Sequence, residues 1–180
     1  MNYGRFDASF SASGDTEPDN KSIFHDIRHF QELRASLVNA IEARKGLILL
    51  TGGEGTGKTM FLHSFIRELK SDVTFIAESD PDASFTDLLK LILRNLDHEA
   101  AGADRLSMLQ TCKRLLRAAM DRGDAICLIL DNAERLCDDT LECVFQNFLG
   151  PAASGDREQK LLQIILAGRP QLRERLSHPP

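Results

Sequence analysis

The sequence predicts an α/β fold, a three-layer sandwich in which helices cover both faces of a mostly parallel sheet. Three observations predict it. Short apolar runs alternate with helix-length amphipathic segments along the 180 residues, which is the pattern of a doubly wound sheet. The run Ile126–Leu130 is apolar throughout, as in a strand buried on both faces. The run Leu47–Leu50 leads directly into a glycine-rich loop followed by an amphipathic segment.

Composition is that of an ordinary globular domain, with 42% apolar and 27% charged residues. The formal net charge of -5 does not favour non-specific nucleic-acid binding, although a local basic patch leaves it open. The N-terminal residues lack the apolar core of a signal peptide, and no apolar run in this chain reaches transmembrane length. We therefore expect a cytoplasmic protein.

The four cysteines do not form a metal-binding pattern. They make no C-x-x-C pair and no histidine cluster accompanies them, so no zinc site is expected. Cys127 lies inside an apolar strand candidate, where a buried, unreactive thiol is expected.

The N-terminal part divides into an arm and the start of the core. Residues 1–22 are rich in Ser, Asp, Gly and Asn, which predicts a flexible N-terminal arm, and residues 23–180 form the core. Apolar residues at three- and four-residue spacing predict a helix from about Asp26 to Arg44. Lys45 and Gly46 end this helix, and the strand Leu47–Thr51 follows.

The middle of the chain predicts a helix from Gly57 to Lys70 and a strand from Val73 to Ala77. Ser84 is predicted to cap the next helix, whose apolar positions run from Phe85 to Leu96. A further helix is expected from Arg105 to Arg122, with inward positions Leu106, Leu109, Leu116, Ala119 and Met120.

The last third begins with the strand Ile126–Asp131. Asp138 or Asp139 is predicted to cap the following helix, which Gly150-Pro151 ends. A strand over Leu162–Ala167 and a short helix over Gln171–Leu176 complete the pattern.

The glycine-rich loop satisfies the pattern G-x-x-x-x-G-K-[ST] at every fixed position. Its glycines allow backbone N–H groups to converge on phosphate oxygens, and the next helix presents its positive end to the same anion. Lys58 would contact the β- and γ-phosphates, and Thr59 would offer its hydroxyl to Mg²⁺. We therefore predict that ATP is bound by Gly52, Gly53, Glu54, Gly55, Thr56, Gly57, Lys58, Thr59 and Met60.

Asp131 supplies the expected second half of the site. Phosphate-loop proteins hold Mg²⁺ with the loop hydroxyl and a carboxylate that ends a neighbouring apolar strand, so Thr59 and Asp131 are the predicted metal ligands. Asn132 follows directly, and its amide can orient a water but cannot accept a proton. Glu134 is the alternative catalytic base if the chain turns it inward; otherwise it is a solvent-facing carboxylate.

Arginines follow the last predicted strand. Arg169 lies at the edge of the presumed cleft, where its guanidinium would sense the γ-phosphate; the alternative is a solvated turn residue beside Pro170. Arg173 and Arg175 are expected to pair with Glu174 on a helix surface.

Three stretches carry a family resemblance. Ala40–Gly46 leads into the strand and phosphate loop, Leu128–Leu136 is similar to a D-E-A-Q-x-L segment, and Leu162–Leu172 is similar to an I-x-L-x-G-Q-P-x-L segment. Over residues 24–180 the chain resembles the AAA+ ATPases of the bacterial general-secretion-pathway protein A (ExeA-like) family. It departs from that family at Asn132, where Glu is usual, and at Glu134 and Arg169, where Gln is usual.

The resemblance also implies parts that this chain lacks. The AAA+ sheet order is usually 5-1-4-3-2, with a helical lid after the fifth strand. This sequence stops after the helix that follows the fourth strand, which implies a core without its fifth strand and lid, as a truncated gene product or a fragment. The strand Leu47–Thr51 would then be an exposed sheet edge.

Two functions follow as expectations. In the first, an AAA+ ATPase hydrolyses ATP and remodels or regulates a partner complex. The resemblance implies envelope-associated secretion or export machinery, peripheral placement at the inner membrane through partners, and homo-oligomerisation. In the second, the chain is a nucleotide-dependent switch with little or no hydrolysis, which Asn132 favours. A small-molecule kinase has little support, because no acceptor-binding motif is recognisable.

Overall fold

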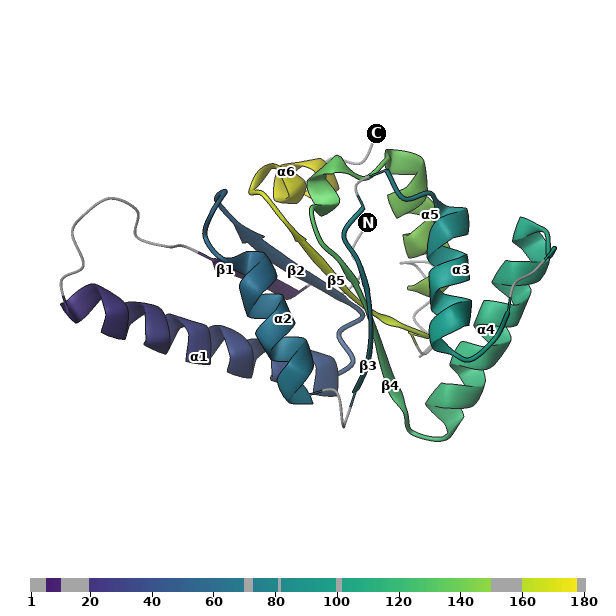
Figure 1. Ribbon diagram of the computed structural model, residues 1–180, viewed down its shortest axis with the longest axis horizontal. Helices are drawn as coiled ribbons and strands as arrows, with labels where there is room; N and C mark the ends of the chain where they lie inside the picture. The colour runs from purple at the N-terminus through teal and green to yellow at the C-terminus, as the bar shows by residue number, and fades with distance from the viewer. Residues whose placement is uncertain are drawn as a thin grey trace.

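The computed structural model describes residues 6–10, 20–69, 73–80, 82–99, 102–149 and 160–177; over 6–10 and 20–29 it describes the backbone alone. The described strands form a parallel sheet in the order β1-β2-β5-β4-β3 (Figure 1). Their bounds are β1 (Phe6–Phe10), β2 (Leu47–Gly52), β3 (Val73–Glu78), β4 (Ala125–Leu130) and β5 (Gln163–Gly168). The predicted α/β fold with a parallel sheet is confirmed.

Helices cover both faces of the sheet (Figure 1). One face carries α1 (Asn20–Glu42) and α2 (Lys58–Leu69), and the other carries α3 (Phe85–Asn95), α4 (Arg105–Asp121) and α5 (Asp138–Phe148). The short turn η1 (Ala133–Arg135) and α6 (Gln171–Ser177) lie where the strands finish.

Alternation along the strands produces two buried clusters, one on each face of the sheet. In β2, Leu47 and Leu49 join the cluster under α3, α4 and α5, whereas Ile48 and Leu50 join the cluster under α1 and α2. A strand must be apolar at every position to serve both clusters. This explains the continuous apolar runs in β2, β4 and β5, which are buried along almost their whole length.

The structure corrects the expectation of a flexible arm at two places. Phe6–Phe10 form β1, which pairs in parallel with β2 from Phe6 beside Ile48 to Phe10 beside Gly52. Asn20 begins α1. Because β2 therefore lies between β1 and β5, the expectation that it forms a sheet edge is also wrong. Phe6, Ala8 and Phe10 alternate with Asp7 and Ser9 as in a half-buried strand, but this pattern is only five residues long and lies within a polar stretch. Residues 1–5 and 11–19 lie outside the described part.

Two helix predictions need correction. Leu106 is 63% exposed rather than inward, because the buried positions of α4 are Met108, Cys112, Leu116 and Ala119. The N-cap of α5 is Cys137, which makes no side-chain capping hydrogen bond. Asp138 and Asp139 lie instead within the first turn, where negative charge complements the helix dipole.

Two of the four cysteines, Cys112 and Cys127, are buried. Cys127 is fully buried, as predicted, and burial raises its pKa; burial also raises the pKa of Cys112 to about 12. Both thiols therefore stay protonated at neutral pH.

Within the described ranges, every helix is too short or too polar to cross a membrane.

Ser84 caps α3, as predicted, through a capping box. Its Oγ accepts a hydrogen bond from the N–H of Asp87, and the carboxylate of Asp87 accepts one from the N–H of Ser84, both at 3.2 Å. We expect Ser84→Ala to lower the free energy of unfolding by about 1 kcal/mol, and the melting temperature by roughly 2–4 °C.

The effect of Ser84→Ala on the melting temperature should depend on pH. Hydrogen bonds from Ser84 hold the pKa of Asp87 below its usual range. This stabilisation exists above the unfolded-state pKa and is lost as pH falls through the folded-state pKa. The difference in melting temperature between wild type and Ser84→Ala should therefore shrink in acid. Calorimetry at neutral and acidic pH measures it, and identical melting at neutral pH would contradict the assigned cap.

Candidate functional site

The carboxyl ends of β2, β4 and β5 meet at one end of the sheet (Figure 1). Strand pairing places Thr51 beside Gly168 and Leu130 beside Leu166. The residues that follow these strands are therefore brought together, although they are far apart in sequence. This end of a parallel α/β sheet is where such folds bind their ligands.

The glycine-rich loop folds around the side chain of Lys58. The Lys58 ammonium donates hydrogen bonds to the carbonyl oxygens of Gly52 at 2.8 Å and Gly53 at 2.7 Å. Gly55 and Gly57 have φ of +72° and +88°, a backbone region that side-chain-bearing residues rarely adopt. These glycines allow the loop to curl back over its own lysine.

Lys58 lies in an electrostatically mixed environment. Burial lowers its pKa from the ordinary value, and the negative charges of Glu134 and Asp131 oppose this shift. The charge of Glu134 acts on Lys58 more strongly than that of Asp131. Two carboxylates that follow β4 thus help to keep the Lys58 ammonium charged.

Asp131 is held in a fixed orientation beside Thr59. The Thr59 hydroxyl donates to Asp131 Oδ2 at 2.6 Å. The other carboxylate oxygen accepts from the N–H of Asn132 at 2.9 Å, and the N–H of Asp131 donates to the carbonyl of Glu78 at 2.9 Å. Asp131 is only 6% exposed. The structure thus brings together the two oxygen-bearing side chains that were predicted as metal ligands.

Asn132 shapes the backbone of this loop. Its φ of 52° and ψ of 34° place it in the left-handed region, which Asn tolerates better than most residues. The side chain is exposed and makes no capping hydrogen bond to η1. The left-handed turn redirects the chain into η1, which carries Glu134.

Glu134 points inward rather than to solvent, and its side chain is 14% exposed. Its Oε2 accepts from the N–H of Arg169 at 3.2 Å, and its Oε1 lies 3.6 Å from Arg169 Nε. Gly168 provides the space: a Cβ at this position would lie 2.4 Å from Glu134 Oε2. Of the two alternatives for Glu134, the inward arrangement is the one found.

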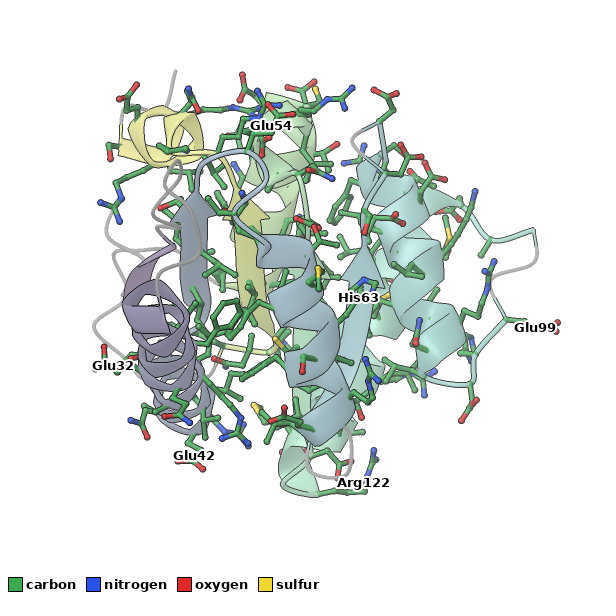
Figure 2. All side chains as sticks on the ribbon, turned by 60° about the vertical axis from the view of Figure 1, so that its left-hand side comes forward. Glu32, Glu42, Glu54, His63, Glu99 and Arg122 are labelled. Carbon is green, nitrogen blue, oxygen red and sulfur yellow. The ribbon has the colours of Figure 1, made fainter. Side chains whose placement is uncertain are left out.

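Arg169 joins the tip of the glycine-rich loop to Glu134. Its Nη2 lies 2.9 Å from Glu54 Oε2, in addition to its contacts with Glu134. Figure 2 shows Glu54 at the end of the molecule where α6 also lies. Met60 is exposed in the first turn of α2. The site therefore gathers the predicted loop, Asp131, Glu134 and Arg169.

Sequence reasoning missed two contributors, Gly168 and Arg175. Gly168 has a signal in retrospect, since a small residue ending a buried strand indicates close approach by another group. Arg175 has no such signal, because its partners are the backbone carbonyls of Glu134 and Leu136 and the carboxylate of Asp138, all far from it in the sequence.

Residues 41–176 match the AAA domain family. The chain belongs to this family. General secretion pathway protein A of Aeromonas hydrophila is 29% identical to this chain over 181 residues, which cover 98% of this chain and 31% of that protein. The chain thus spans about a third of the length of this curated relative. The resemblance predicted from the sequence is confirmed.

Solved structures support the fold of this AAA domain. It resembles Cdc6p from Pyrobaculum aerophilum with a TM-score of 0.59 and 23% identity, over 91% of this chain and 42% of that one. It also resembles the ORC2 protein of Aeropyrum pernix, solved as ADPNP-ADP complexes, with a TM-score of 0.55 and 17% identity over 85% of this chain and 44% of that one. At these identities the likeness concerns the fold alone.

The strand order of the sheet can be set beside the order that the resemblance implies. The order β2-β5-β4-β3 corresponds to the 1-4-3-2 part of the expected AAA+ order. β1 occupies the place beside β2 where the fifth strand was expected. The position that the sequence predicted as vacant is therefore filled by an N-terminal strand.

Proposed function

We propose that this AAA domain binds ATP with Mg²⁺ through Gly52–Met60 and Asp131, and that it hydrolyses ATP with Glu134 as the general base. The observation that carries the proposal is the inward position of Glu134, whose charge acts on Lys58 and whose carboxylate contacts Arg169. A phosphate-binding loop alone would support binding, whereas an inward carboxylate beside it also supports chemistry.

Binding would use groups that already converge. The loop presents its backbone and the Lys58 ammonium, which now contacts only neutral carbonyl and hydroxyl oxygens within hydrogen-bond distance among the described residues. An anionic phosphate oxygen is a stronger partner than a carbonyl. The ammonium would exchange these contacts for the β- and γ-phosphates, and the positive end of α2 adds to the attraction.

The residues present fit Mg²⁺. Thr59 and Asp131 offer hard oxygen donors 2.6 Å apart, and this ion takes few protein ligands besides water and phosphate oxygens. When bound, Mg²⁺ neutralises charge that develops on the phosphates. Asp131 would hold its place through the hydrogen bonds from Thr59 and the N–H of Asn132.

Hydrolysis would use Glu134 to accept a proton from the attacking water. Arg169 would turn its guanidinium from Glu54 toward the γ-phosphate, because a pair in which Glu54 is highly exposed holds it weakly. This movement would also remove the Arg169 Nε contact from Glu134. The amide of Asn132 would orient the water without taking its proton.

The partner complex that we propose is inferred from the similarity to a relative. The relative in Aeromonas hydrophila is a general secretion pathway protein, so we propose that ATP turnover here remodels or regulates an envelope-associated secretion or export complex. Self-association and peripheral placement at the inner membrane through partners are part of the same proposal.

One observation favours a second function, a nucleotide-dependent switch with little hydrolysis. Asn132 follows Asp131 directly, and the alternative base Glu134 is engaged by Arg169 through two contacts. In that case ATP would change partner binding without being consumed.

Phosphate release by the purified protein tests the proposal. We expect release that requires Mg²⁺ and stops when EDTA removes it, because without the ion held at Thr59 and Asp131 the charge that develops on the phosphates is not neutralised there. ATP binding without phosphate release would favour the switch. Failure to bind ATP in the presence of Mg²⁺ would overturn both functions.

A further inference from the structure

The guanidinium of Arg175, on α6, lies against the turn that carries Glu134. Its Nη1 donates to the carbonyl of Glu134 at 3.1 Å, and its Nη2 donates to the carbonyl of Leu136 at 2.6 Å. Its Nε donates to Asp138 Oδ1 at 2.7 Å. The side chain is 25% exposed. This differs from the surface pairing with Glu174 that the sequence suggested.

These contacts meet a specific structural need. η1 is a short 3-10 turn, so it satisfies few of its own carbonyl groups. α5 begins immediately afterwards without a side-chain cap. One planar guanidinium supplies donors to the turn and an ion pair to Asp138 in the first turn of α5. The fixed fork of arginine suits this multiple contact better than a flexible ammonium.

The segment from Arg169 to Arg175, which includes most of α6, therefore holds Glu134 at both ends. Arg175 contacts the backbone carbonyl of Glu134, and the N–H of Arg169, just before α6, contacts its carboxylate. Leu172 lies between the two arginines and is fully buried in the core under α3, α4 and α5. A segment anchored in this way contacts both the main chain and the carboxylate of Glu134.

We propose that Arg175 is a positioning residue for Glu134, which it serves by holding η1 in place. The proposal rests on the proposed hydrolytic function. Arg175 itself does not contact the phosphate-binding loop through any described hydrogen bond or ion pair; it acts through the main chain of Glu134. Misplacing a catalytic group by about 1 Å can cost on the order of 100-fold in rate.

Arg173 offers a matched control. It lies on the same helix and carries the same charge, but its side chain is exposed and makes no ion pair or hydrogen bond with any described residue. Arg173→Gln should leave turnover and ATP affinity unchanged. Arg175→Gln should lower kcat by about 10- to 100-fold, while the Kd for ATP stays within about 2-fold. Arg175→Lys should recover part of the rate, because an ammonium still donates to carbonyls.

A double variant separates positioning from general destabilisation. If Arg175 acts through Glu134, Arg175→Gln should have no further effect on turnover in a Glu134→Gln background. A further loss there, or a normal kcat with a lowered melting temperature alone, would overturn the proposal.

Amide hydrogen exchange keeps the test independent of activity. In nucleotide-free protein, amides of residues 133–137 should exchange faster in Arg175→Gln and Arg175→Lys than in wild type or Arg173→Gln. Unchanged exchange in this turn would overturn the role of Arg175. Absence of phosphate release by wild type would instead overturn the proposed hydrolysis, so the two failures are distinguishable.

Discussion

Lys58→Ala is expected to weaken ATP binding by about 10- to 150-fold, the range that corresponds to one lost charge-assisted hydrogen bond. The Lys58 ammonium is the charge around which the glycine-rich loop is folded, through the carbonyls of Gly52 and Gly53. Its removal deletes the direct contact with the β- and γ-phosphates. Titration with a fluorescent ATP analogue, with Mg²⁺ present, measures the loss.

Stability should change far less than affinity. Burial lowers the pKa of Lys58, which means that folding the charged form carries a desolvation penalty. The alanine variant removes this penalty along with the three hydrogen bonds that the ammonium donates. Lys113→Ala is a suitable control, since Lys113 lies on α4 and contacts Asn147. Equal ATP affinity of Lys58→Ala and wild type would refute the phosphate-binding assignment.

Glu134→Gln is expected to lower turnover by about 100- to 10,000-fold, the usual contribution of a general base. ATP affinity should be retained, because the amide keeps the shape of the carboxylate and still accepts a hydrogen bond from the N–H of Arg169. Single-turnover phosphate release together with equilibrium binding separates the two quantities.

Two further variants identify the acting side chain. Glu142→Gln changes a carboxylate on α5 that contacts Gln146 rather than the site, and should leave turnover intact. Asn132→Gly removes the amide but accepts the left-handed backbone that Asn132 adopts. Full turnover in Glu134→Gln combined with lost turnover in Asn132→Gly would assign the water-orienting role to Asn132 and reject Glu134 as the base.

The parts of this site that depend on fixed local spacing were predictable. The loop residues Gly52, Gly57, Lys58 and Thr59 are close in sequence, and their geometry follows from strand, turn and helix. Asp131 was predictable because it ends an apolar strand of the same sheet. Both predictions rest on residue type and periodicity, which a single sequence displays.

The inward direction of Glu134 was not predictable, because it depends on three residues together, two of which lie far from Glu134 in the sequence. Asn132 adopts a left-handed turn, Gly168 leaves space, and Arg175 holds the main chain. In the sequence, each of these three residues alone has an ordinary explanation. β1 was missed for a different reason: its alternation of apolar and polar residues is only five residues long and lies within a polar stretch.

The placement of β2 has a consequence for how the chain acquires its structure. Leu47 pairs with Ile164 on one side, and Ile48 pairs with Phe6 on the other. During synthesis, the apolar strand β2 leaves the ribosome long before its partner β5 has been translated. Non-local pairing of this kind is slow, and the uncovered strand is prone to aggregate. We therefore expect the phosphate-binding loop to be among the last regions to mature, well after its own residues have been translated.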